Sequence, residues 1–130
     1  MVNILILAIH AHQIANADHS AYPLSTGIVV EPRSKSLVLN GYPGTVQFFH
    51  HATDTHVREV EVTPRNRMSR TEAKEIMHPH VHHVAFSQNG DWMATIDERP
   101  DRLLDTERYL HFWKFDHDQQ TYALSFTEYL

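Results

Sequence analysis

The sequence contains no cysteine, and this absence sets the first limits on its chemistry. Disulfide bonds, thiolate nucleophiles and zinc ribbons are therefore excluded. The 130 residues also contain no Gly-rich phosphate loop and no Gly-x-Ser-x-Gly nucleophile elbow. Together these absences argue against an enzyme, and we expect no cofactor.

Positive charge is also scarce. The chain has 11 Lys and Arg residues against 16 Asp and Glu residues, which gives a formal net charge of −5. A protein that coats nucleic acid through bulk positive charge would show the opposite balance. The composition therefore argues against that class of protein.

Apolar runs long enough to cross a bilayer are missing as well. The N-terminal run, residues 1–9, is apolar but short, and no basic residues precede it as they would precede a secretory core. We interpret it as a buried strand and expect no membrane partner.

What the sequence does contain is regular alternation of apolar and polar side chains. Residues 81–87, 92–96 and 109–115 alternate with the period of a strand. Asn and Gly tolerate positive φ, so the Ser-Gln-Asn-Gly-Asp stretch at 87–91 predicts a tight turn. A polar loop over residues 97–108 then leads to the aromatic third strand. Strand, turn, strand, loop and aromatic strand are typical of the antiparallel meander in one propeller blade.

An earlier stretch of the chain repeats this pattern. Sliding residues 28–49 forward by 56 positions places Val30 on Phe86 and brings the first two strands of each stretch into register. An internal repeat of this kind indicates two copies of one structural unit. Strands are predicted over residues 27–30, 36–39, 45–49 and 56–62 in the first copy, and 121–127 completes the second copy.

The predicted fold is therefore all-β, with two consecutive four-stranded antiparallel blades of an incomplete β-propeller. Large aromatic side chains at strand spacing are expected to be buried between the blades. These side chains are Phe48, Phe49, Phe86, Trp92, Phe112 and Trp113. The chain divides into an N-terminal strand and connection (1–23), a first blade (24–62), a polar, basic inter-blade loop (63–80) and a second blade (81–130).

The 12 histidines raise the alternative of a metal site. His78, His80 and His82 have period-2 spacing, which places three imidazoles on one face of an extended segment, and zinc or nickel accepts such ligands. If these histidines bind a metal, the chain is a His-rich metal-binding protein or a small metal-dependent enzyme. The competing interpretation is a solvated, His-rich loop that leads into a strand.

Acidic residues gather in the loop expected over residues 97–108. They are Asp97, Glu98, Asp101, Asp105 and Glu107. A general acid needs a dry pocket or a charged neighbour to move its pKa. We interpret this loop as solvated and assign no catalytic residue to the chain.

A basic stretch lies between the two predicted blades. Its positive side chains are those of Arg65, Arg67, Arg70 and Lys74. They are candidates for contact with RNA phosphates or with a protein partner. No aromatic side chain is interleaved to stack on bases, so a loop ordered by a partner is the competing interpretation.

With the repeat laid out, the chain resembles the WD-repeat family. Residues 84–90, Val-Ala-Phe-Ser-Gln-Asn-Gly, look like that family's first strand and turn. Phe112 and Trp113 look like its third-strand ending, with Lys114 where the family usually has Asp.

A narrower resemblance is to the second propeller of the WD-repeat protein 75 family. The strings that carry it are residues 28–41, residues 43–49 with Pro-Gly-Thr-Val-Gln-Phe-Phe, and residues 92–99. The resemblance implies a non-catalytic scaffold of the small-subunit processome, in its UTP-A subcomplex. It further implies a nucleolar location in the nucleus, a role in pre-rRNA transcription and processing during ribosome biogenesis, and contacts with protein subunits and pre-rRNA.

A complete propeller needs several more blades than two. An open pair of blades exposes unpaired strand edges, and such edges invite association with another chain. We therefore expect the isolated chain to self-associate through its exposed blade edges.

Overall fold

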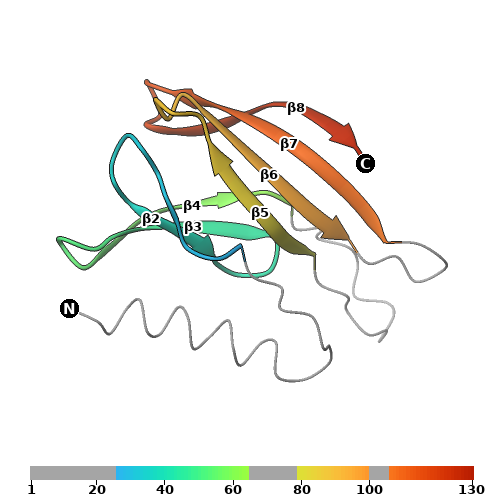
Figure 1. The fold of residues 1–130 in the computed structure, drawn as a ribbon, viewed down its shortest axis with the longest axis horizontal. Helices are drawn as coiled ribbons and strands as arrows, with labels where there is room; N and C mark the ends of the chain where they lie inside the picture. Colours follow the sequence, from blue (N-terminus) through green and yellow to red (C-terminus); the bar gives the residue numbers. More distant parts are fainter. Residues whose placement is uncertain (1–25, 65–78, 100–105) are drawn as a thin grey trace, which may run out of the picture.

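A computed structural model describes residues 26–64, 79–99 and 106–130 and shows two four-stranded antiparallel sheets (Figure 1). The first sheet consists of β1 (Val29–Val30), β2 (Leu37–Asn40), β3 (Thr45–His50) and β4 (Thr55–Glu61). The second consists of β5 (His80–Phe86), β6 (Trp92–Arg99), β7 (Glu107–Asp116) and β8 (Thr121–Tyr129). The described residues include no helix that could span a membrane.

Each sheet is a simple meander, because its strands are neighbours in space in the same order as in the chain. This confirms the predicted fold of two four-stranded antiparallel blades of an incomplete propeller. The strand expected over residues 1–9 lies outside the described residues, as does most of the inter-blade loop.

The predicted loop over residues 97–108 is wrong at both ends. Strand β6 continues to Arg99, and β7 already begins at Glu107. Glu98 lies opposite Arg108, and Arg99 lies opposite Glu107. Opposite charges on facing strands stabilise pairing, so residues that look like a polar loop in the sequence extend the ladder instead.

One hydrophobic core joins the two sheets. β5 lies beside β3, and β8 lies beside β4. The inward faces of both sheets supply the core side chains: Val38, Val46, Phe48, Val60, Val62, Val81, Val84, Met93, Trp113, Phe115 and Tyr122.

The prediction of aromatic side chains buried between the blades is confirmed for Phe48 and Trp113, which lie in this core. Phe49 is buried and Phe112 is half-buried, but neither belongs to the core. Phe86 is half-buried against the core. Trp92 contradicts the expectation, because 38% of it is exposed. Met93 and its period-2 neighbours on β6 face the core, so the strict alternation of a strand turns Trp92 to the opposite face.

Candidate functional site

The histidines proposed as metal ligands do not form a ligand set in the described residues. His80 and His82 lie on β5, and His78 lies outside the described part of the chain. The ladder shifts register between Val81 and His83, so a bulge at His82 interrupts the period-2 spacing. The imidazole Nε2 of His82 lies 2.7 Å from Glu98 Oε2, in contact with a carboxylate.

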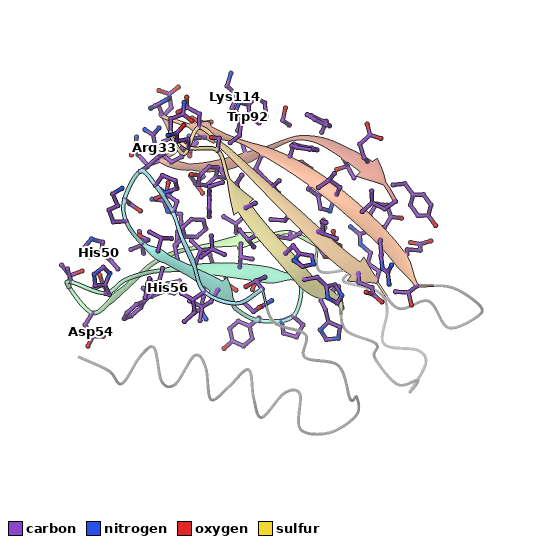
Figure 2. All side chains as sticks on the ribbon, viewed as in Figure 1. Arg33, His50, Asp54, His56, Trp92 and Lys114 are labelled. Carbon is purple, nitrogen blue, oxygen red and sulfur yellow. The ribbon has the colours of Figure 1, made fainter. Side chains whose placement is uncertain are left out.

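A second group of polar side chains lies at the β3–β4 hairpin, where Figure 2 labels His50, Asp54 and His56. The ring of His50 is hydrogen-bonded through Nδ1 to the Thr53 hydroxyl, 3.0 Å away. Across residues 26–64, 79–99 and 106–130, no three His, Asp or Glu side chains converge closely enough to hold a metal ion.

The basic candidates Arg65, Arg67, Arg70 and Lys74 all lie outside the described residues. Contact of this stretch with RNA or with a partner therefore stays a prediction.

In the described structure, a cluster of polar side chains surrounds Asp97, which was predicted to lie in a solvated loop. Its side chain is 0% exposed because β6 carries it into the interface between the sheets. The Thr63 hydroxyl donates to Asp97 Oδ2 at 2.7 Å, and Arg99 Nε donates to the same oxygen at 3.1 Å. His111 Nε2 lies 2.6 Å from the other oxygen, Oδ1.

These neighbours decide the ionisation of Asp97. Burial by itself raises the pKa of a carboxyl, because the charged form loses its hydration. The contacts from His111, Thr63 and Arg99 outweigh burial and hold the pKa of Asp97 below its usual value. Asp97 is therefore a buried, paired carboxylate. Its environment lowers its pKa, whereas a general acid needs an environment that raises the pKa.

The same face of the second sheet contains a row of β7 rings, two of which hydrogen-bond to threonine hydroxyls on the neighbouring strands. Trp113 Nε1 donates to the Thr95 hydroxyl at 2.9 Å, and both side chains are buried. His111 Nδ1 is hydrogen-bonded to the hydroxyl of Thr127 on β8 at 2.7 Å. The ring of Tyr109 stacks on His111. These contacts tie β6, β7 and β8 together.

A second buried carboxylate, Glu31, joins the two sheets at the other end. The Ser34 backbone N–H donates to its Oε2 at 2.7 Å, and the Tyr122 hydroxyl donates to its Oε1 at 2.7 Å. Burial raises the pKa of Glu31, but the hydrogen bonds from Ser34 and Tyr122 lower it further than burial raises it.

Arg33 closes this end of the interface. Its Nη1 lies 3.0 Å from Asp91 Oδ1 in the second sheet's first turn. Its guanidinium carbon lies 4.0 Å from the centre of the Phe115 ring, in cation–π geometry. The arginine thus packs a first-sheet turn onto the second sheet.

In both buried clusters the polar groups contact one another, some within one strand or turn and others between strands and sheets. The Thr63 hydroxyl donates to a carboxylate, and not to an imidazole that would activate it as a nucleophile. A signal for Asp97 was present in the sequence, because Met93, Thr95 and Asp97 continue one period-2 face. The preference of carboxylates for loops obscured it.

The opposite face of the second sheet is partly apolar and uncovered in the described structure. Trp92 and Lys114 lie next to each other there, with Lys114 Nζ 5.9 Å from the Trp92 ring centre (Figure 2). Phe112 and Phe126 stack on this face, with ring centres 4.5 Å apart. A sheet with one face in the core and the other bearing aromatics is suited to packing against a further layer.

The family model and the individual relatives that match this chain all point to the same protein family. Residues 28–128 match the family described as the second β-propeller of WD repeat-containing protein 75. The chain is 33% identical over 104 residues to WD repeat-containing protein 75 of Danio rerio, a match that covers 80% of this chain and 12% of the relative. The Xenopus laevis protein of the same name is 28% identical over 106 residues, again 80% and 12% of the two chains. The Homo sapiens protein is 27% identical over 100 residues, 77% of this chain and 12% of the relative.

The chain thus spans about 12% of the length of the curated relatives it matches. The matched region includes β1 to β7 and all but the last residue of β8, and the order of the strands in two meanders is that of consecutive blades. The chain therefore belongs to the WD repeat-containing protein 75 family, as part of its second β-propeller.

Proposed function

We propose that this chain is part of a non-catalytic propeller scaffold of the small-subunit processome, in its UTP-A subcomplex. In this role it supports pre-rRNA transcription and processing in the nucleolus. The observation that carries the proposal is the family match over residues 28–128. A scaffold presents strand edges and loops to protein subunits, which fits a fold made entirely of blades in the described residues.

The use of the buried polar groups supports the non-catalytic part of the proposal. Asp97 is occupied by Thr63, Arg99 and His111, and Glu31 by Ser34 and Tyr122. Catalytic groups need room beside them for a substrate. Side chains engaged in holding strands together supply rigidity instead.

The test uses the full-length protein that carries these blades, tagged and recovered from cells. We expect it to concentrate in the nucleolus and to be recovered with other processome subunits and pre-rRNA. Replacing the fully buried Phe48 with Ala removes a core side chain, at a cost of about 3–5 kcal/mol, and lowers the recovery. Ile28→Ala, at a 57% exposed position, serves as the control that leaves recovery unchanged. Recovery of the unaltered protein without these subunits, away from the nucleolus, contradicts the proposal.

The basic stretch of Arg65, Arg67, Arg70 and Lys74 is proposed as the contact with pre-rRNA. Phosphate contacts release counterions, so they weaken as salt rises. Reversing the charge of these four residues is expected to weaken RNA binding and flatten its salt dependence. Unchanged affinity and slope at two salt concentrations would remove this stretch from the RNA contact.

A further inference from the structure

Strand β8 has an open edge in the described structure. It is the last strand of its sheet and pairs only with β7. At 9 residues it is long for an edge strand, and from Ala123 onward its side chains are exposed. Unpaired N–H and C=O groups along such a strand form a template for another strand.

A neighbouring blade would not cover this edge. Blades of a propeller pack face to face around the ring. A further blade would therefore cover the aromatic face around Phe112 and would not pair with the edge of β8. The availability of β8 therefore does not depend on how many blades surround it.

The usual protections of an edge strand are weak here. Residues 121–129 contain no Lys, Arg or Pro. A bulge shifts the register near Phe112 and Trp113, but pairing with β7 continues on both sides of it. Apolar side chains also line the strand: Leu124, Phe126 and Tyr129 are 53%, 46% and 66% exposed.

One hydrogen bond near the end of β8 shows which of its backbone N–H groups face β7 and which face the open edge. The Leu130 N–H donates to the Arg108 carbonyl at 3.0 Å, so this N–H points toward β7. Successive residues of a strand point their N–H groups in opposite directions. The N–H groups of Tyr129 and Thr127 therefore point away from β7, toward the open edge.

Charge selects the kind of strand that fits this edge. Glu128 is the charged side chain on β8, and Asp116 and Asp118 lie beside its first residues, at the end of β7 and in the turn that follows. A second copy of the chain would bring these same negative charges to the edge. An incoming strand with apolar side chains and flanking Lys or Arg would instead complement the charge.

We propose that β8 binds an extended, basic segment of a protein partner, which adds to the second sheet as a fifth strand. Main-chain hydrogen bonds supply affinity in this mode, and alternate side chains contact the exposed apolar residues. The inference rests on the sheet and its charges alone, and it stands independently of the proposed role in ribosome assembly.

The experiment uses the full chain and a labelled synthetic peptide, Lys-Lys-Thr-Val-Thr-Val-Thr-Lys-Lys, followed by fluorescence anisotropy at low salt. A second peptide has Glu in place of every Lys. We expect the Lys peptide to bind at least about tenfold more tightly than the Glu peptide. Hydrogen exchange is expected to slow at the outward amides of Thr127 and Tyr129, which identifies the edge, and not the aromatic face, as the contact.

Leu124→Lys places a positive charge on the edge and is expected to weaken binding of the Lys peptide about tenfold. Val30→Lys is the matched control, because Val30 on β1 is 52% exposed, almost as much as Leu124. The control is expected to bind like the unaltered chain. Equal binding of the two peptides to the unaltered chain overturns the proposal. So does protection of Thr127 and Tyr129 in the chain alone at concentrations where it dimerises, since a second copy would then occupy the edge.

Discussion

The Tyr122 hydroxyl on β8 lies 2.7 Å from the Glu31 carboxylate, although 91 positions separate the two residues in the chain. Tyr122 belongs to the second sheet and Glu31 to the turn that follows β1 of the first, and only 3% of Tyr122 and 2% of Glu31 are exposed. The hydroxyl also lies 2.7 Å from the Gly90 carbonyl oxygen, in the turn that joins β5 to β6. This contact fastens the end of the second sheet to the first.

Tyr122→Phe removes this hydroxyl and keeps the ring. The Glu31 carboxylate then stays buried with one donor fewer, and we expect the free energy of unfolding to fall by about 1–3 kcal/mol. Urea unfolding followed by circular dichroism measures the change. Tyr129→Phe, at a largely exposed position, is the matched control, and an equal loss in both variants would contradict the role assigned to Tyr122.

The two buried carboxylates predict that the fold is destabilised by acid. The pKa values of Asp97 and Glu31 are lowered in the folded state. Their contribution to stability is therefore complete above the unfolded-state pKa values, about pH 4. It is lost as the pH falls through the lowered folded-state values.

Asp97→Asn tests this dependence, because an amide does not titrate. We expect the variant to be less stable at pH 7 and to lose less stability than the unaltered chain between pH 5 and about pH 2. Asp118→Asn, in the exposed β7–β8 turn, is expected to keep the original pH dependence. Urea unfolding at a series of pH values gives the comparison, and parallel curves for the Asp97→Asn chain and the unaltered chain would refute the prediction.

Gly90 occupies a backbone conformation and a space that only glycine fits. Its φ is +76°, and an added Cβ would lie 2.4 Å from Arg33 Cγ and 3.2 Å from the Arg33 backbone N. We expect Gly90→Ala to lower the free energy of unfolding by about 2–4 kcal/mol, from backbone strain and displacement of Arg33. Gly27→Ala separates the two causes, since Gly27 has φ of +71° with nothing within 4 Å of its Cβ position. A similar loss in both variants would show that the contact with Arg33 contributes nothing.

Self-association of the isolated chain is expected through its exposed blade edges. Because the proposed basic partner strand uses β8, we expect this association to use the other edge strands, β1, β4 or β5, and to leave hydrogen exchange at Thr127 and Tyr129 unchanged. Multi-angle light scattering over a range of protein and salt concentrations measures the mass. A monodisperse monomer under all conditions would contradict the expectation.

The alternation of side chains located the eight described strands and their division into two meanders, although it ended β6 too early and began β7 too late. Trp113 and Phe48 were also correctly predicted to lie in the core, because burying a large aromatic ring at an inward position of a strand is strongly favourable. The repeat added the pairing order, since two similar units of four strands fold in the same way.

Other features depended on partners far away in the chain. From the sequence, Asp97 was predicted to lie in a solvated loop. The structure buries it because Thr63 and His111 contact its carboxylate. Trp92 was predicted to be a core residue, but the inward face of β6 is the one that carries Met93, so Trp92 lies on the opposite face.

The sequence by itself determined which segments become strands, because alternation with period 2 is a local property of neighbouring residues. Only the tertiary structure decided which polar groups are buried and which edge stays open. Burial of a charge depends on the donors that other strands bring to it, and an edge is open only when no other strand pairs with it.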